Sequence, residues 1–303
     1  MQTQTRSAMR PAPSTLAIVA ALLVVSLAFG GNFLWIRVVV QSVPPLILQA
    51  TRFFCGGAIL YVLAMWRTSE PPPNAIQWRN AAVGGALLIA TSQGLLAWSE
   101  VSISAGLTVL LASTIPIWTT VLGAIFLGER PSALGVAGTV IGFLGLIPIV
   151  LSHGTSAASL VPVFALLGAA LCWAVGTLLT QRLNMHPDGF VAAAMQLLCG
   201  GTLLAAASLV LGEEHHIAAN ALSPINLAGI AYLTIIGSIV GYATYVWLVR
   251  RAHAAVASMF AYIQTVFAVY LGWLILHETV TLGMLAGGAA VITGVALVVA
   301  TRK

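Results

Sequence analysis

Residues 105–151 of the chain read AGLTVLLASTIPIWTTVLGAIFLGERPSALGVAGTVIGFLGLIPIVL, and a stretch near the C-terminus repeats their pattern. Residues 254–300 read AAVASMFAYIQTVFAVYLGWLILHETVTLGMLAGGAAVITGVALVVA, and they align with the first stretch at an offset of 149 positions. The identical residues paired by this offset include Gly123 with Gly272, Glu129 with Glu278, Gly138 with Gly287, and Gly145 with Gly294.

The repeat continues upstream of both stretches. Trp98 pairs with Trp247 at the same offset, and an offset of 144 pairs the Cys-Gly-Gly of residues 55–57 with that of residues 199–201. Single glycine matches mean little in a glycine-rich chain, but matched acids, tryptophans and a triplet indicate one unit used twice. We therefore divide the chain into a tail (1–13), a first unit (14–151) and a second unit (152–300).

The composition is that of an integral membrane protein. Of the 303 residues, 60% are hydrophobic and only 6% are charged, and the mean hydropathy is +1.02. Soluble domains carry about 25% charged residues, so a soluble fold is excluded. The apolar runs are continuous, whereas the strands of a membrane β-barrel alternate between lipid-facing and lumen-facing residues. The sequence therefore predicts an all-α integral membrane protein.

Neither the charges nor the cysteines indicate a further class of partner. The net charge is +5, but the basic residues are scattered singly at the ends of apolar runs, so we expect no nucleic-acid partner. Cys55, Cys172 and Cys199 lie inside apolar runs without metal-ligand spacing. We expect buried thiols, no disulfide framework, no metal and no cofactor.

Ten segments meet the requirement of about 20 mostly apolar residues for a membrane-spanning helix. They are residues 16–36, 46–66, 80–98, 107–127, 133–151, 161–181, 190–211, 225–249, 254–276 and 282–300. Prolines punctuate several breaks between them, because proline fixes φ and suits the first turn of the next helix. The first segment is longer than the apolar core of a signal peptide, so we expect it to be retained.

Basic residues predict the orientation of these ten helices. Arg37 is the one basic residue in the loops at one end, where the acidic pair of residues 213–214 also lies. The loops and termini at the other end hold Arg6, Arg10, Arg67, Arg79, Arg130, Arg182, Arg250, Arg251, Arg302 and Lys303. We therefore expect both termini in the cytoplasm of a bacterium, with the chain in the inner membrane.

Five helices in each unit is an odd number, so the two units must cross the membrane in opposite directions. Inverted repeats of this kind are typical of secondary transporters, in which the substrate site lies near the midplane between the units. Two equivalent units can exchange conformations, which predicts alternating access.

The chain also resembles a known transporter family. Pro116 in the fourth predicted helix, the Leu-Gly-Glu of residues 127–129 and the glycine-spaced fifth helix are similar to the EamA repeat of the drug/metabolite transporter superfamily. The resemblance implies a basket in which helices 1–4 and 6–9 surround a central cavity, and it favours the aromatic amino-acid exporters within the superfamily. The second unit departs from the pattern at residues 277–278 (His-Glu) and at Thr265, the position equivalent to Pro116.

Polar and aromatic side chains inside the predicted helices are the candidates for a cavity wall. Rings provide apolar contact area, and hydroxyls and amides fix the orientation of a substrate. The alternative is that the polar groups bond one helix to another and that the tryptophans anchor helix ends at the interface. The candidates are Asn32, Arg52, Gln93, Thr114, Trp118, Trp173, Thr177, Ser238, Tyr242, Tyr262 and Thr265.

Arg52 is the charged residue placed inside a predicted helix. A charge near the bilayer centre costs about 2.5–3.5 kcal/mol and therefore indicates a functional site, here one suited to a substrate carboxylate. The alternative is that the side chain extends to the nearby interface. The offset of 144 makes Gln196 its counterpart, and Gln49 lies one turn before it.

The acids and histidines predict no coupling or metal site. We interpret Glu129 and Glu278 as structural residues at helix ends, and Glu100 as a solvated acid in a short loop, with a gate residue as the alternative. Because no carboxylate lies deep in the first helix, facilitated diffusion is favoured over proton coupling. The adjacent residues His215 and His216 are only a weak metal candidate.

The sequence thus predicts a secondary transporter that exports small metabolites, with aromatic or other neutral amino acids as the favoured substrates. Nucleosides, drugs or other solutes are the alternative within this class. A membrane-embedded enzyme is the alternative outside it, although we find no nucleophile–base pair and no P-loop motif. The expected partners are a small-molecule substrate and membrane lipid. We expect a monomer, with a dimer as the alternative.

Overall fold

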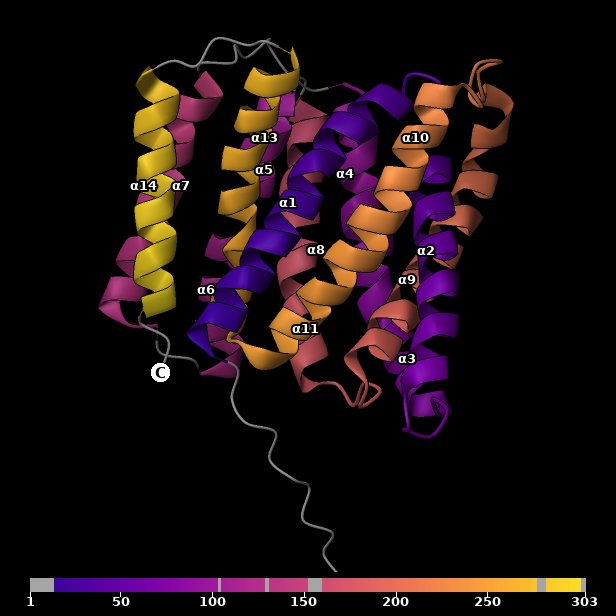
Figure 1. Cartoon of the computed structure of the whole chain (residues 1–303), viewed down its shortest axis with the longest axis horizontal. Coiled ribbons are helices and arrows are strands. Elements are labelled where there is room, and N and C mark those ends of the chain that lie inside the picture. The colour runs from indigo at the N-terminus through magenta and orange to yellow at the C-terminus, as the bar shows by residue number, and fades with distance from the viewer. Residues whose placement is uncertain (1–13, 103–104, 129–130, 152–159, 277–281, 301–303) are drawn as a thin grey trace, which may run out of the picture.

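The computed structural model describes residues 14–102, 105–128, 131–151, 160–276 and 282–300, and within these ranges every regular element is a helix (Figure 1). The first half contains α1 (Thr15–Val39), α2 (Pro45–Arg67), α3 (Ala75–Gly84), the π-helical η1 (Gly85–Thr91), α4 (Ser92–Glu100), α5 (Ala105–Ala112), α6 (Ile115–Leu127) and α7 (Ala133–Leu151). The second half contains α8 (Leu160–Arg182), α9 (Gly189–Leu211), the 3-10 turn η2 (Glu213–His216), α10 (Pro224–Tyr232), the π-helical η3 (Leu233–Tyr242), α11 (Ala243–Arg251), α12 (Ala254–Ser258), α13 (Phe260–Leu276) and α14 (Leu282–Ala300).

Several positions singled out in the sequence lie outside the described residues. They are the tail of residues 1–13, Glu129, Arg130, His277, Glu278, Arg302 and Lys303.

Local signals explain where several helices begin and end. The Ser14 hydroxyl accepts a hydrogen bond from a backbone amide of the first turn and so caps α1. Asn74 and Gln77 form a capping box at the start of α3. Gly128 and Gly212 follow α6 and α9 with φ values of 65° and 67°, a left-handed conformation that glycine adopts without steric cost.

The helix predicted over residues 107–127 is divided in the structure. α5 ends at Ala112 and α6 begins at Ile115, with Pro116 in the first turn of α6. Proline has no amide hydrogen to donate to a preceding carbonyl, so the hydrogen-bond ladder is interrupted before it. The helix predicted over residues 254–276 is likewise divided, into α12 and α13.

Glycines bring α7 against α14 at one edge of the bundle (Figure 1). A Cβ added at Gly138 would lie 2.7 Å from the carbonyl oxygen of Gly294. A Cβ added at Gly145 would lie 2.8 Å from the carbonyl oxygen of Gly287. Only glycine allows the two backbones to approach this closely.

α2 and α9 meet through glycines in the same way. A Cβ at Gly57 would lie 2.8 Å from the amide nitrogen of Leu198, and a Cβ at Gly201 would lie 2.7 Å from the amide nitrogen of Phe54. This contact joins the two halves of the chain directly.

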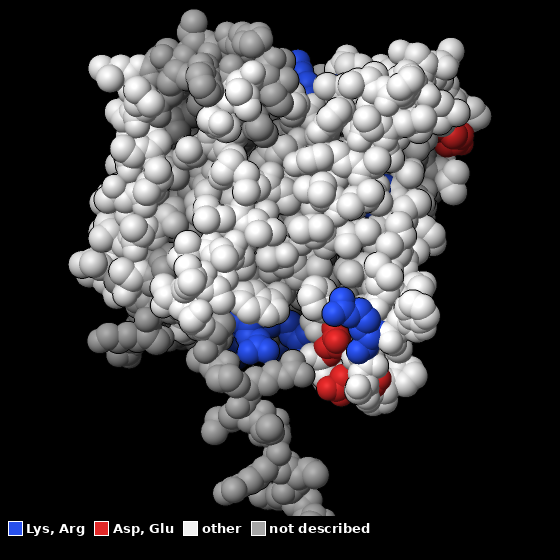
Figure 2. All heavy atoms as spheres, viewed as in Figure 1, with Lys and Arg blue, Asp and Glu red and all other residues white. Residues whose placement is uncertain are grey.

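The outside of the bundle is apolar. Within the described ranges, six helices are long and apolar enough to span a membrane, and four shorter apolar helices of 10–17 residues accompany them. Figure 2 shows most of the face without charged side chains; the largest group of them lies at the lower edge, and a few lie near the upper edge and the upper right. Exposed leucines, isoleucines, valines and phenylalanines are spread over the helices, as contact with lipid requires. The chain is thus an all-helical membrane protein, and its count of ten spans stays a prediction.

The expectation of buried thiols is wrong. Cys55 is exposed, Cys172 and Cys199 are half-buried, and all three are free. Cys55 directly precedes Gly56 and Gly57, which face neighbouring helices. Successive helical residues point about 100° apart, so the thiol is directed outward.

Candidate functional site

A cavity lies at the centre of the bundle, between α1, α2, α4, α8, η3 and α13. Its volume is about 50 Å³. The space is too narrow for a metabolite unless side chains or helices move. Its wall is mostly apolar, with a few polar groups that converge from several helices, the composition typical of a small-molecule site.

Arg52 of α2 is the charged residue in the cavity wall. Its side chain is 1% exposed, so it lies in the interior and does not extend to the interface. Nη2 donates a hydrogen bond to Oε1 of Gln93 on α4 at 3.1 Å, and the guanidinium lies 4.2 Å above the ring of Phe53. Nε and Nη1 have no hydrogen-bond partner in the structure. Two nitrogens therefore remain free to bind a carboxylate.

Amides surround this guanidinium. Nε2 of Gln49 donates to the backbone carbonyl oxygen of Gln93 at 2.8 Å, which fixes α2 against α4. Asn32 of α1 also lines the cavity, and its Oδ1 has no hydrogen-bond partner. A Cβ at Gly237 of η3 would lie 2.5 Å from this oxygen, so the glycine makes room for the amide. Unsatisfied buried polar atoms are costly and favour a polar ligand.

A cluster of aromatic rings forms another part of the cavity wall. Trp173 of α8 stands edge-on to Phe29 of α1 at 6.1 Å between ring centroids and to Tyr242 of η3 at 6.3 Å. Phe260 of α13 completes the cluster, 5.3 Å from Phe29. Nε1 of Trp173 is buried without an acceptor. The cavity thus has a cationic and amide side and an aromatic side.

Five of the eleven candidate residues line this cavity. They are Asn32, Arg52, Gln93, Trp173 and Tyr242. The remaining six lie outside its wall.

Two of these six lie on α13 and bond it to other parts of the bundle. The Tyr262 hydroxyl donates to the carbonyl oxygen of Thr139 on α7 at 2.9 Å. The Thr265 hydroxyl lies 2.9 Å from the hydroxyl of Ser113, a residue in the break between α5 and α6. Both residues therefore have the inter-helix role that the sequence left as an alternative.

Of the other four, Thr177 also bonds one helix to another, because its hydroxyl on α8 hydrogen-bonds to that of Tyr245 on α11. The hydroxyls of Thr114 and Ser238 donate to carbonyl oxygens of their own local chain, at 2.7 and 3.0 Å. Trp118 packs against the core with its Nε1 unpaired. A regular spacing of polar residues predicts which face of a helix they share, but not the neighbour that this face meets.

The interpretation of Glu100 as a solvated loop acid is wrong. It is the last residue of α4 and is 2% exposed, and neither carboxylate oxygen has a hydrogen-bond partner. The sequence-based prediction ended this helix at Trp98 and left Glu100 in the connection that follows. It also missed Gln264 of α13, which is 3% exposed and lines the cavity.

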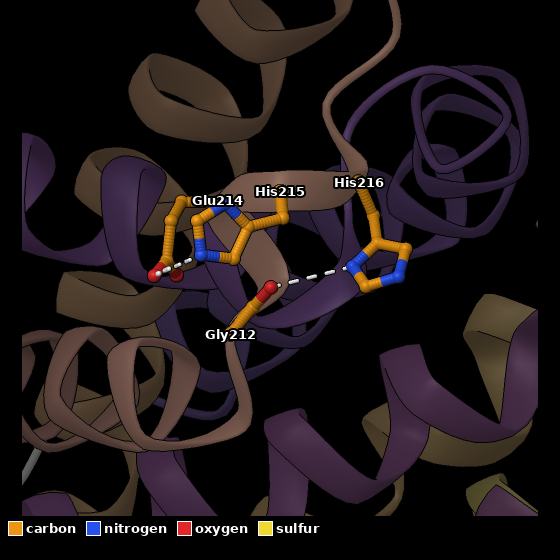
Figure 3. Close-up of polar contacts among 4 residues, drawn as sticks. All are labelled: Gly212, Glu214, His215 and His216. Carbon is orange, nitrogen blue, oxygen red and sulfur yellow. Dashed lines mark hydrogen bonds and ion pairs between the residues drawn. The ribbon is translucent and has the colours of Figure 1, made fainter.

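The two histidines of η2 do not converge on a common point (Figure 3). Nε2 of His215 lies 3.6 Å from the carboxylate of Glu214, whereas Nδ1 of His216 lies 3.3 Å from the carbonyl oxygen of Gly212. In the described part of the chain, no three His, Cys, Asp or Glu residues form a group that could hold a metal ion.

An apolar helical exterior around a mostly apolar cavity that contains a buried arginine is typical of a membrane transport protein. The chain belongs to the EamA-like transporter family, whose model matches residues 16–151 and 160–300.

Related proteins support the same class. The uncharacterized inner membrane transporter YedA of Escherichia coli K12 is 29% identical over 259 residues, covering 85% of this chain and 82% of that protein. A protein of Streptantibioticus cattleyicolor named "Probable terminal-alkyne amino-acid exporter" is 27% identical over 226 residues, covering 75% and 74%. A solved crystal structure at 21% identity shares the fold, with a TM-score of 0.72 and coverage of 95% and 96%. The family and the two named relatives are transporters or exporters, so the alternative of a membrane-embedded enzyme is not retained.

Proposed function

We propose that the chain is a secondary transporter that exports small carboxylate-bearing metabolites, with neutral amino acids, including aromatic ones, as the favoured substrates. The observation that carries this proposal is Arg52, a buried guanidinium in the cavity wall with two nitrogens unpaired. It would bind the substrate carboxylate, as a charge-assisted hydrogen-bonding group. The aromatic side of the cavity, around Trp173, would receive the substrate's apolar part.

We further propose ten spans in two inverted units of five helices. The offset of 149 makes Gly138 equivalent to Gly287 and Gly145 equivalent to Gly294. The close contacts are crossed, because Gly138 meets Gly294 and Gly145 meets Gly287. Crossed contacts arise when equivalent helices run antiparallel, whereas parallel copies would pair each glycine with its own equivalent.

The second glycine contact supports the same arrangement. The offset of 144 makes Phe54 equivalent to Leu198 and Gly57 equivalent to Gly201. Gly57 meets Leu198 and Gly201 meets Phe54, which is again a crossed pattern. One pseudo-twofold axis perpendicular to the helices would produce both sets of contacts, as in inverted-repeat transporters.

The distribution of charge supports both termini in the cytoplasm. α1 begins and α14 ends at the lower edge of the bundle in Figure 1. The arginines that end α2, α8 and α11 lie at this edge, where Figure 2 shows the charged side chains gathered. Positive residues favour the cytoplasmic side, so this edge would face the cytoplasm.

The choice of amino acids over other solutes rests on the charge of the cavity. A cationic substrate would need an acid in the wall, and the described wall contains none. Nucleosides carry no carboxylate and would leave Arg52 without an anion. The name of the Streptantibioticus relative, an amino-acid exporter, agrees with this choice.

The test is flux through the purified full chain in proteoliposomes loaded with labelled phenylalanine, leucine or uridine. We expect saturable flux of the amino acids, reduced at least about tenfold in Arg52→Gln, a loss of about 1.4 kcal/mol or more. Arg67→Gln, at the exposed end of the same helix, should transport normally. Arg52→Lys keeps the positive charge. Flux retained in this variant would show that the loss in Arg52→Gln comes from the missing charge and not from a folding defect. Flux of uridine without flux of either amino acid would contradict the proposed substrate class.

A further inference from the structure

A solvent-facing pocket lies at the lower edge of the bundle, between the ends of α8 and α11 (Figure 1). Its volume is about 340 Å³, against about 50 Å³ for the central cavity. Asn184 and Arg250 in its wall are exposed, so the pocket is open to the solvent at this end. Pockets of this size commonly hold small molecules. The solvent-facing pocket is therefore large enough to receive a metabolite.

A narrow pocket of about 10 Å³ extends from the solvent-facing pocket into the bundle. The two pockets share four residues of their walls, among them Thr180 of α8 and Val249 of α11. The wall of the narrow pocket also includes Tyr245, whose ring centroid lies 5.0 Å from that of Trp173 in the wall of the central cavity. The narrow pocket thus lies between the solvent-facing pocket and the central cavity.

Pairs of side chains in contact separate the narrow pocket from the central cavity. Tyr242 lines the central cavity, and its hydroxyl donates a hydrogen bond of 2.7 Å to Gln196, which lines the narrow pocket. Trp173 and Tyr245 are a second such pair, with one ring on each side. The walls of the two spaces have no residue in common. Side chains, and no intervening helix, therefore close the passage at this point.

Two hydrogen bonds hold these side chains in place. Tyr242 bonds to Gln196 of α9, and the hydroxyl of the buried Tyr245 hydrogen-bonds to Thr177 of α8. The two tyrosines lie three residues apart, and their ring centroids are 5.9 Å from each other, so they share one helix face. A movement of this face would displace both rings together.

The tyrosines lie where a π-helix passes into an α-helix. η3 ends at Tyr242 and α11 begins at Ala243. Within η3 the hydroxyl of Ser238 donates to the carbonyl oxygen of Leu233, five residues earlier, at 3.0 Å. Short π-helical segments are frequent at functional sites, and a shift of one residue back to α-helical register would rotate the residues that follow by about 100°. Such a rotation would turn the tyrosines out of the partition.

We propose that Tyr242 and Tyr245 form a gate between the central cavity and the lower edge of the bundle, and that the transported solute passes this gate between α8 and α11. The gate is closed while the bonds to Gln196 and Thr177 are formed, as in this structure, and it opens when they break. This inference rests on the transporter class of the chain and not on the proposed substrate.

The test measures the access of a thiol reagent to cysteines placed on either side of the gate. The full chain, with its native cysteines replaced by alanine, is treated in membrane vesicles with a membrane-impermeant methanethiosulfonate. Asn184→Cys, in the solvent-facing pocket, identifies the side that exposes the lower edge. From this side, Ala192→Cys in the narrow pocket should react faster than Ala170→Cys in the central cavity. Reaction of Ala170→Cys first, or as fast as Asn184→Cys, would overturn the proposal.

The next step weakens the gate without removing a ring. Tyr245→Phe loses only the bond to Thr177, so Ala170→Cys should react at least about threefold faster. Tyr262→Phe is the matched control, because it removes a buried hydroxyl bond outside the gate and should leave the rate unchanged. Equal rates with and without the Tyr245 hydroxyl would overturn the proposal.

A third cysteine distinguishes opening of the gate from general loosening of the bundle. Ala81 is fully buried and lies outside the walls of all three pockets. Ala81→Cys should stay unreactive in Tyr245→Phe, and equal acceleration at Ala81→Cys and Ala170→Cys would overturn the gate. Because labelling needs no substrate, a lack of amino-acid flux would contradict the proposed substrate alone.

Discussion

The hydroxyl of Tyr242 donates a hydrogen bond of 2.7 Å to Oε1 of Gln196, and this pair is the second-half counterpart of Gln93 and Arg52. Tyr242 follows Gln93 by 149 positions and Gln196 follows Arg52 by 144, the two offsets of the repeat. The bond between Arg52 and Gln93 joins α2 to α4 in the first half. The bond between Gln196 and Tyr242 joins α9 to η3, the equivalent elements of the second half. The contact is thus present in both halves, with a cation in one and a neutral pair in the other, as the proposed repeat predicts.

Removing the hydroxyl of this neutral pair should lower stability. In Tyr242→Phe the ring remains, but Oε1 of the buried Gln196 loses its donor, at a cost of about 1–3 kcal/mol. Thermal unfolding of the purified protein should detect this as a lowered Tm. Tyr61→Phe is the matched control, because Tyr61 is half-buried and its hydroxyl makes no hydrogen bond within the described chain. Equal Tm values for the two variants would show that the Tyr242 bond contributes nothing.

The sequence predicted the helical class, because apolar runs of sufficient length carry that information locally. It also located Arg52, since a charge inside such a run is conspicuous. It could not predict that Tyr262 and Thr265 turn toward α7 and toward Ser113, because the direction of a helix face depends on packing between helices distant in sequence. Glu100 was misplaced for the same reason: an acid is tolerated inside only where distant arginines offset its charge.

The contact between α7 and α14 should tolerate no side chain at its centre. In Gly138→Ala the new Cβ would lie 2.7 Å from the carbonyl oxygen of Gly294, so the helices must separate, at about 1–3 kcal/mol. Gly168→Ala on α8 meets nothing within 4 Å and should gain up to about 1 kcal/mol from helix propensity. Unfolding of both variants in the same detergent measures the difference. A Gly138→Ala protein as stable as Gly168→Ala would contradict the close approach.

Two adjacent glutamates in η2 should differ sharply in their effect on stability. Glu213 accepts hydrogen bonds from the backbone amides of Leu46 and Ile47, at 3.3 and 3.0 Å, and so caps α2 from outside that helix. Its removal in Glu213→Ala should cost about 1–2 kcal/mol. Glu214 contacts only the exposed His215 at 3.6 Å, so Glu214→Ala should have little effect. Chemical unfolding of the two variants side by side provides the comparison, and equal losses would refute the capping role.

A carboxylate built into the protein should compete with the substrate for Arg52. Gln93→Glu places an anion of nearly the same shape where the neutral amide oxygen now lies 3.1 Å from Nη2. The ion pair formed would satisfy the guanidinium internally, so affinity for phenylalanine should fall by at least about tenfold, or about 1.4 kcal/mol. Gln93→Leu removes the amide and leaves Arg52 with a third unpaired nitrogen, so it should bind carboxylates at least as well as the unmodified chain. Binding titrations on both variants distinguish a competing charge from simple disturbance of the cavity, because disturbance would weaken both alike.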